Sequence, residues 1–179
     1  MRNINKPIYV VFALVLLIPL LSFSQNSEDL DSLRHKRMKA AREIMTSTKT
    51  CALITLDEEG RPRVRAMEPF IPESDFTVWF GTNTKSRKIT QIKKDPKVTL
   101  YYLDSDGSGY VMIHGIAQIV NDQKEKDKRW KVGWENFYTN KNEDFILLKV
   151  VPEWMEVFSF KYGLKGDPIT WEVPKVIFD

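Results

Sequence analysis

The sequence predicts a small, mainly antiparallel β-barrel with peripheral helices. From residue 50 onward, apolar and polar residues alternate in short runs, which is the period of half-buried strands. Several runs are joined by turn-forming residues, which favours hairpins over a parallel sheet. With 42% hydrophobic residues among 179, and no internal repeat or linker, the composition suits one domain with a packed core.

The first 24 residues have the pattern of a bacterial secretory signal peptide. Two bases and no acid precede an almost wholly apolar run over residues 7–21, and the small residues Ser22 and Ser24 follow it. We therefore expect cleavage after Ser24. Residues 25–179 would then form the folded domain of an exported protein, periplasmic or secreted.

A retained membrane anchor is the alternative, because the apolar run falls only slightly short of the roughly 20 residues that span a bilayer. Pro19 and the small residues after the run favour cleavage. The cleaved chain loses Arg2 and Lys6 but no acid, which leaves 25 bases against 24 acids. This near-neutral balance argues against a barrel that binds nucleic acid, and we expect no stable membrane anchor after cleavage.

The mature chain begins with an amphipathic helix, predicted over residues 26–46. The period then changes to two, and residues 50–70 predict a hairpin whose turn is built on Glu59 and Gly60. A third strand is predicted over residues 76–81.

The second half of the chain alternates short helices and strands. Its predicted elements are a helix over residues 86–94, a hairpin of strands over residues 98–103 and 110–120, a surface helix over residues 123–135, and a long strand over residues 145–160. Ile89 and Ile92 share one face of the first of these helices. Pro152 is expected to bend the long strand or to mark a bulge in it.

Metal and thiol chemistry are not indicated. The single cysteine, Cys51, cannot form an internal disulfide, and it lies in an alternating strand with no neighbouring base, so we interpret it as a small apolar filler. Two histidines far apart in the sequence give no zinc-binding pattern.

Residues 80–100 carry the clearest signal for ligand binding. A strand there ends near Thr82, and Ser86, Arg87 and Lys88 begin a helix. The free N–H groups of a helix N-terminus, together with a guanidinium and an ammonium group, suit a phosphate monoester. The alternative is that both bases are simply solvated. Bases at a helix start are unfavourable without an anion, and this favours the ligand.

Four segments resemble a known family in order and spacing: GRPRVRAM, WFGTNTKSRK, QIKKDPKVTLYY and YVMIHGIAQIV. They resemble the pyridoxamine 5'-phosphate oxidase-like FMN-binding split β-barrels, especially the general stress protein branch. The resemblance covers about residues 33–160. It implies an antiparallel split barrel that binds FMN in a groove between the two subunits of a homodimer.

The resemblance also implies which residues contact the cofactor: Arg65, Ala66, Met67, Phe80, Gly81, Thr82, Ser86, Arg87, Lys88 and Tyr110. Arg87 and Lys88 would hold the FMN phosphate. The alternative for Arg65 is a surface ion pair with Glu68 or another acid, and the alternative for Tyr110 is an ordinary half-buried strand residue. His114 shares a strand face with Tyr110 and is interpreted as structural.

Two departures from the oxidase itself argue against vitamin B6 oxidation. The oxidase has a flavin-contacting lysine where this chain has Phe70. The final residues, ITWEVPKVIFD, contain neither the arginine nor the histidine that the oxidase uses for its substrate. Trp171 in this segment is a candidate lid or dimer-contact residue.

The resemblance therefore implies a flavin-dependent oxidoreductase that acts on an unknown small molecule or electron donor. The chemistry would belong to the flavin ring, so no catalytic residue and no metal is assigned. The alternative is a non-catalytic protein that binds a flavin or another planar ligand in the same groove. Reduction of the bound flavin with turnover would separate the two.

Overall fold

The structure is a computed structural model that describes residues 30–178. The expected signal peptide, residues 1–24, lies outside the described residues. Residues 30–47 form a helix, which confirms the described part of the helix predicted over residues 26–46. No helix in the described part of the chain is both long and apolar enough to cross a membrane.

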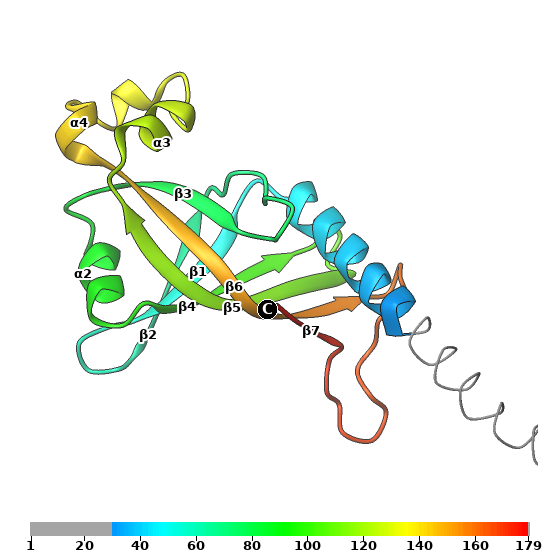
Figure 1. Cartoon of the computed structure of the whole chain (residues 1–179). Helices are drawn as coiled ribbons and strands as arrows, with labels where there is room; N and C mark the ends of the chain where they lie inside the picture. Colours follow the sequence, from blue (N-terminus) through cyan, green and yellow to red (C-terminus); the bar gives the residue numbers. More distant parts are fainter. Residues whose placement is uncertain (1–29, 179) are drawn as a thin grey trace, which may run out of the picture. The chain divides into compact units, whose positions relative to one another are not determined.

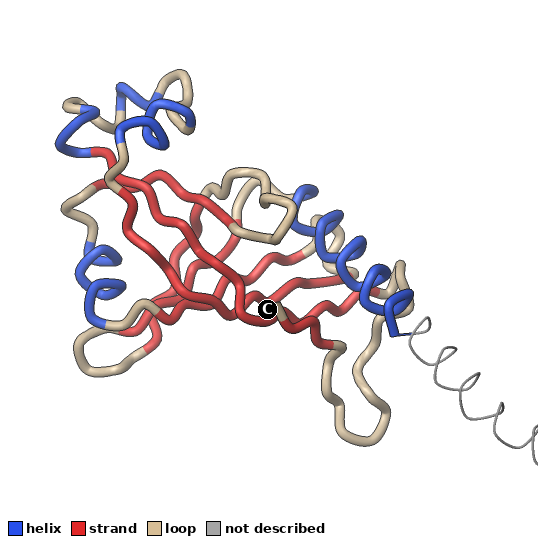
Figure 2. The backbone as a smooth tube through the Cα atoms, in the orientation of Figure 1, coloured by secondary structure: helices blue, strands red, loops and turns tan. Residues whose placement is uncertain are grey.

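A seven-stranded antiparallel sheet forms the body of the protein (Figures 1 and 2). The elements are β1 (Cys51–Leu56), β2 (Pro62–Met67), β3 (Val78–Asn83), α2 (Arg87–Lys94), β4 (Lys97–Leu103), β5 (Gly109–Val120), α3 (Gln123–Lys128), the 3-10 helix η1 (Trp134–Asn136), α4 (Lys141–Asp144), β6 (Phe145–Ser159) and β7 (Lys175–Ile177). Hydrogen-bonded neighbours follow the order β2-β1-β4-β5-β6-β3, and β7 also pairs with β6. Because this path ends at β2 and β3 without joining them, the sheet is open, as the predicted split barrel requires.

Both predicted hairpins are confirmed. β1 pairs with β2 from Cys51–Met67 to Leu56–Pro62, and β4 pairs with β5 along its whole length. Gly60 in the first turn has a left-handed backbone (φ 76°), which glycine adopts without steric cost. The turn places β2 at the edge of the sheet, next to β1.

β6 is the longest strand and holds the two halves of the sheet together. Its first half pairs with β3, its second half with β7, and most of its length with β5. The β5–β6 register shifts between His114 and Gly115, where His114 lies opposite Trp154 and Gly115 opposite Pro152. The extra residue on β6 is a bulge, which confirms the irregularity expected at Pro152.

The predicted surface helix over residues 123–135 is wrong as a single element. α3 ends at Lys128, Gly133 takes a left-handed backbone (φ 87°), and the short elements η1 and α4 follow. We call residues 121–144, between β5 and β6, the insert. The aromatic side chains of the insert pack against one another, so the chain that carries them cannot continue as one helix. The short strand β7 was not predicted.

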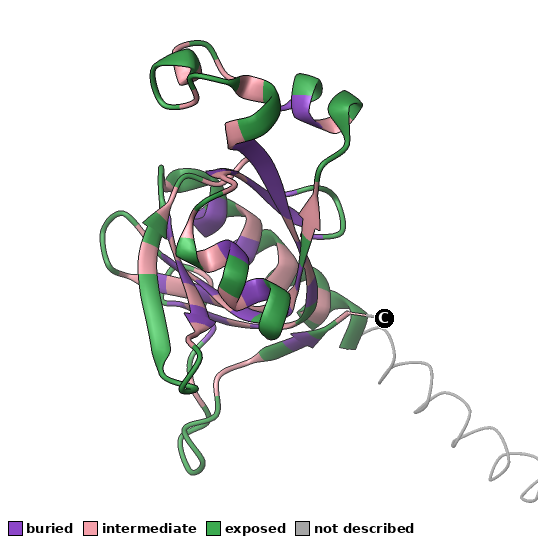
Figure 3. Cartoon of the chain, turned by 90° about the vertical axis from the view of Figure 1, so that its left-hand side faces the viewer, coloured by how far each residue is buried: buried purple, intermediate pink, exposed green. Residues whose placement is uncertain are grey.

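The described residues form two hydrophobic clusters. The main one lies between the sheet, α2 and residues 38–47 of the leading helix. The smaller one joins the insert to the start of β6 through Trp79, Phe145, Leu147 and partly buried aromatic residues, including Trp130 and Trp134. Figure 3 shows the buried stretches along the strands, whereas turns and loops are largely exposed.

Candidate functional site

The loop from β3 to α2 brings three predicted residues together. Lys88 Nζ donates hydrogen bonds to Thr82 Oγ1 at 2.8 Å and to Ser86 Oγ at 2.6 Å. Thr82 lies near the end of β3, Ser86 is the N-cap of α2, and Lys88 is in its first turn. Ser86 makes no side-chain cap hydrogen bond, and the first turn of α2 contains no acid. A cation and two hydroxyls therefore lie beside a helix N-terminus.

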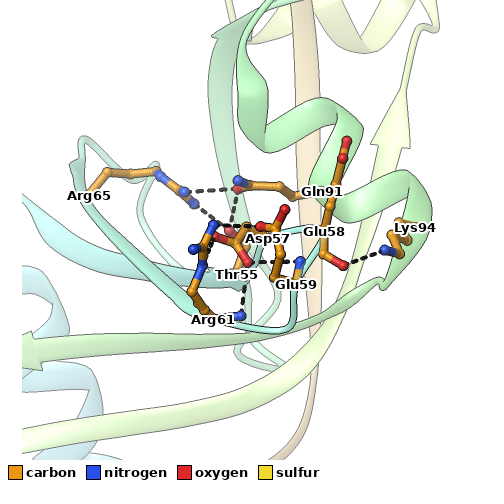
Figure 4. Close-up of polar contacts among 8 residues, drawn as sticks. All are labelled: Thr55, Asp57, Glu58, Glu59, Arg61, Arg65, Gln91 and Lys94. Atoms are coloured by element: carbon orange, nitrogen blue, oxygen red, sulfur yellow. Dashed lines mark hydrogen bonds and ion pairs between the residues drawn. The ribbon is translucent and has the colours of Figure 1, made fainter.

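Arg65 reaches this region from the edge strand β2. Its Nη1 donates to Thr55 Oγ1 on β1 at 2.8 Å, and its Nη2 donates to Gln91 Oε1 on α2 at 3.0 Å (Figure 4). Thr55 Oγ1 also donates to Gln91 Oε1 at 2.6 Å. The surface ion pair considered for Arg65 is not formed, because Glu68 pairs with Lys131 instead. Arg65 is thus held by neutral acceptors that leave its charge uncompensated.

We call Arg65, Thr82, Ser86, Arg87 and Lys88 the cationic corner. Within residues 30–178, none of its three bases forms an ion pair with a carboxylate. Burial lowers the pKa of Lys88, and the neighbouring Arg65 lowers it further. The pKa of Arg65 is lowered by burial and by the charges of Arg63 and Arg87. Arg65 and Lys88 are half-buried and Arg87 is exposed. Clustered cations without counter-charges are unfavourable unless an anion joins them.

The insert holds the loop that leads into the corner. The backbone N–H of Thr84 donates to the carbonyl of Asp144 at 2.8 Å, and Thr84 Oγ1 donates to the carbonyl of Glu143 at 2.9 Å. Asn83 accepts a hydrogen bond from the backbone N–H of Lys85 at 2.9 Å, which closes a local turn. The end of α4 therefore positions the segment between Thr82 and Ser86.

Two further predicted residues, Phe80 and Gly81, lie on β3, and their surroundings are set by packing. Phe80 is fully buried in the main cluster. A Cβ added to Gly81 would lie 2.5 Å from the Trp134 ring and 2.7 Å from the Phe145 ring, so the insert requires glycine there. Contact with a cofactor from these two residues would have to come from the backbone.

Ala66 and Met67 follow Arg65 on β2. Ala66 is exposed, and Met67 is half-buried against the main cluster. Both belong to the edge strand that carries Arg65, as the resemblance requires, and their contact with a cofactor stays a prediction.

Tyr110 is not brought to the cationic corner within one chain. It stacks between Tyr101 and Phe158, with ring centroids 5.4 and 5.6 Å away. The backbone N–H of Ala117, seven residues further along β5, donates to the carbonyl of Pro96 just after α2. At about 3.3 Å per residue, Tyr110 lies roughly 20 Å along the strand from that point. Any role at the corner would require a second subunit to supply it.

His114 and Cys51 have the structural surroundings that the sequence indicated. His114 stacks on Trp154, with centroids 5.4 Å apart, and its Nε2 lies 3.5 Å from Glu153. Cys51 is 4% exposed, and burial raises the pKa of its thiol to about 12, so it is a poor nucleophile. In the described part of the chain, no group of three or more His, Cys, Asp or Glu residues could hold a metal.

Sequence reasoning missed the residues that orient the corner: Thr55, Thr84 and Gln91. Gln91 stands four residues after Arg87, so helical spacing places it on the same face of α2, and this signal was available. Thr55 lies at an inward position of β1, where a polar residue is uncommon. The contact of Thr84 with the insert had no signal in the sequence.

Several solved structures of differently named proteins have the same fold. A protein of Clostridium acetobutylicum related to general stress protein 26 of B. subtilis has 24% identity and a TM-score of 0.62, over 75% of this chain and 89% of that one. General Stress Protein 26 of Bacillus anthracis has 24% identity and a TM-score of 0.58, over 70% and 93%. An F420 reductase has 21% identity and a TM-score of 0.52, over 64% and 94%. At these identities the similarity shows a shared fold.

No curated protein matches this sequence. The family described as pyridoxamine 5'-phosphate oxidase like matches residues 36–163, which include the sheet as far as β6, α2 and the whole cationic corner. This match covers well over half of the sequence, and the observed open antiparallel sheet is the fold that the resemblance predicted. The chain therefore belongs to the pyridoxamine 5'-phosphate oxidase-like family.

Proposed function

We propose that this protein binds FMN through the cationic corner and is a flavin-dependent oxidoreductase that acts on a small molecule. The observation that carries the proposal is the uncompensated positive charge of Arg65, Arg87 and Lys88 beside two hydroxyls. A phosphate monoester carries nearly two negative charges at pH 7 and offers three acceptor oxygens. It would supply the counter-charge that the described residues lack.

The residues present fit such a group. Lys88 would offer its charge together with the Thr82 and Ser86 hydroxyls, and Arg87 would offer a guanidinium from the first turn of α2. Thr55 and Gln91 would keep Arg65 aimed at the corner. When bound, FMN supplies hydride or electron transfer at its ring, and the protein binds and orients it. Phe70, where the oxidase has a flavin-contacting lysine, packs edge-on against Trp134 of the insert, so we do not propose vitamin B6 oxidation.

The test is titration of the purified protein with FMN, followed by addition of NADH or NADPH. Saturable changes in the flavin absorbance spectrum are expected, and then bleaching with repeated turnover when an acceptor is present. Binding without reduction by any donor would favour the non-catalytic alternative. Absence of FMN binding would overturn the proposal.

FMN affinity should fall at alkaline pH. Binding requires protonated Lys88, so FMN binds with full affinity at pH values below the pKa of Lys88. The affinity falls as the pH rises through that pKa. Because that pKa is lowered, the decline should begin at a lower pH than the ordinary lysine value of 10.5 would give. The measurement is the FMN dissociation constant against pH, and Lys88→Arg is the control because its guanidinium stays charged. Identical profiles for the two proteins would show that Lys88 does not contact the phosphate.

We also propose a homodimer, with Tyr110 supplied to the site by the partner subunit. The outer face of β4, β5 and β6, with the turn just after β6, carries a row of rings in which neighbouring centroids are 4.9 to 5.6 Å apart: Tyr101, Tyr110, Phe158 and Phe160. Leu103 at the end of β4 is 53% exposed. Large apolar patches on a protein surface mark sites of association.

Phe158→Lys should therefore convert the dimer into a monomer, because it would place a charge in the middle of the ring stack. Light scattering coupled to size-exclusion chromatography measures the oligomeric state. A FMN titration of the variant should show weaker binding if the site spans two subunits. Val132→Lys is the control, since Val132 is fully exposed in the insert. A wild-type monomer at micromolar concentration would contradict the proposal.

Export remains part of the proposal and depends on the pattern of the first 24 residues. The mature protein should begin at Gln25, which the intact mass of protein from the periplasm or medium would show. A full-length chain retained in the cell membrane would support the uncleaved anchor instead.

A further inference from the structure

The charges of the mature chain are unevenly distributed. Residues 32–43 and 160–178 together contain eight bases and three acids. Because residues 25–179 contain 25 bases and 24 acids in total, the rest of the mature chain has 17 bases against 21 acids. A protein that is nearly neutral as a whole therefore carries its excess positive charge in two segments. Such an asymmetry indicates a partner with negative charge.

The two basic segments meet beside the end of β6. Arg37 Nη1 on the leading helix donates a hydrogen bond to the carbonyl of Lys175 on β7 at 2.9 Å. Glu43, the one acid of residues 32–43, forms an ion pair with Lys161 just after β6, so its charge is neutralised. We call residues 37–43 and 160–178 the basic end.

Two bases of the basic end are free to meet a partner. Lys161 is already paired and has the acids of the β4–β5 turn nearby, and Lys175 lies 3.7 Å from a carboxylate of β6. Lys39 and Lys165 are exposed, and neither forms an ion pair with a carboxylate within residues 30–178. These two side chains therefore offer uncompensated positive charge to the solvent.

The loop between β6 and β7 adds two large apolar side chains to the basic end. Ile169 is 87% exposed and Trp171 is 81% exposed. The tip of the loop is a hydrogen-bonded turn, in which the Asp167 carboxylate accepts from the backbone N–H groups of Ile169 and Thr170, both at 2.8 Å. The N–H of Trp171 donates to the carbonyl of Asp167 at 2.9 Å, and Trp171 has a left-handed backbone (φ 61°), which is unfavourable for a bulky residue. The turn therefore holds both apolar side chains out in water.

This loop is not a lid over the cationic corner of its own chain. Thr82 of the corner pairs with Ile146 near the start of β6, whereas the loop follows Ser159 at the end of that strand. At about 3.3 Å per residue, the strand between them spans roughly 40 Å. Figure 1 shows the loop, in orange and red, far from α2. The lid considered for Trp171 would therefore need a second subunit.

We propose that the basic end binds the surface of a membrane that contains anionic phospholipids. Lys39 and Lys165 would face the lipid phosphates, and Ile169 and Trp171 would enter the boundary between headgroups and acyl chains, where Trp is favoured. A nucleic acid could stack on Trp171 but has no apolar layer for Ile169, so a membrane is the partner that suits both kinds of group. The inference does not depend on the flavin site. Binding of this kind is peripheral and weakened by salt, so it adds no stable anchor to the cleaved chain.

The test is co-sedimentation of the full mature chain with vesicles of equal parts phosphatidylglycerol and phosphatidylcholine, and with vesicles of phosphatidylcholine alone. The mixed vesicles should bind at least about tenfold more tightly. Lys39→Gln, Lys165→Gln should weaken binding to them by about thirtyfold, the equivalent of roughly 1 kcal/mol for each base.

Tryptophan emission reports entry of the loop tip into the lipid. Trp171 is the one exposed tryptophan among residues 30–178, so its emission should shift to shorter wavelength when mixed vesicles are added. Trp171→Asn should abolish this shift and weaken binding. Asn is chosen because it tolerates a left-handed backbone, so the turn is preserved.

The matched control is Lys124→Gln, Lys128→Gln, which removes two exposed charges from α3, outside the basic end. It should keep the wild-type affinity for mixed vesicles within about twofold. Equal losses in the two double variants, or equal binding to both kinds of vesicle, would overturn the proposal.

Two other results would assign the basic end to a different partner and would also overturn the proposal. One is binding of duplex DNA, weakened by Lys39→Gln, Lys165→Gln, without binding to vesicles. The other is conversion of a dimer into a monomer by Trp171→Asn, which would place the loop tip in a subunit interface. FMN titrations of the same variants should give the wild-type constant, so failure of this inference leaves the FMN proposal standing.

Discussion

The double variant Arg87→Ala, Lys88→Ala is expected to lose at least about a hundredfold in FMN affinity. Hydrogen bonds to charged groups contribute roughly 1.5–3 kcal/mol each, and two would be removed. Lys88 is also the hydrogen-bonding partner of Thr82 and Ser86, so these hydroxyls would lose their alignment. Fluorescence titration with FMN measures the loss, and circular dichroism establishes that the variant is folded.

A control of equal charge separates a local contact from general attraction. Lys93 and Lys97 are exposed, and in the described part of the chain neither side chain hydrogen-bonds to a residue of the cationic corner. The double variant Lys93→Ala, Lys97→Ala also removes two positive charges. It should keep the wild-type FMN affinity within about twofold, since exposed charges are screened by salt. Equal losses in the two double variants would mean that the phosphate does not lie at the corner.

Gly115→Ala is expected to lower the melting temperature by roughly 3–10 °C. A Cβ at this position would overlap the carbonyl oxygen of Val151 and press on Pro152 across the β5–β6 bulge. Both neighbours are backbone, so the strand itself must move, and overpacking of this kind costs about 1–3 kcal/mol. In a domain of this size each kcal/mol shifts the melting temperature by about 2–4 °C.

Differential scanning calorimetry measures the shift, with Gln118→Ala as the control. Gln118 is exposed on the same strand, and a surface change of this kind usually stays within about 0.5 kcal/mol. Equal melting temperatures for the two variants would show that the β5–β6 bulge tolerates a side chain at position 115.

The local sequence pattern was sufficient to predict the strands that pair with their neighbours in the sequence. β1 with β2, and β4 with β5, follow from alternation and turn residues, because a hairpin needs only local information. α2 follows from the spacing of Ile89 and Ile92, which are both buried. The same reasoning was wrong in the insert. There Trp130 and Trp134 pack against Phe145, which belongs to β6, so a contact outside the predicted helix decides their positions.

Within the candidate site, the residues that lie close in sequence could be predicted together. Thr82, Ser86 and Lys88 span one loop and one helical turn, and they meet as expected. The orientation of Arg65 could not be derived, since its partners Thr55 and Gln91 come from two other elements.

The sequence by itself determined the strand and helix segments of the family fold and a basic helix start suited to an anion, because these depend on periodicity and on neighbouring residues. Tertiary structure alone decided that Arg65 joins that helix start without a counter-charge. It also placed Gly81 under Trp134 and left Tyr110 at a distance. These outcomes depend on which distant segments pack together, and packing is a property of the whole sheet that no local pattern contains.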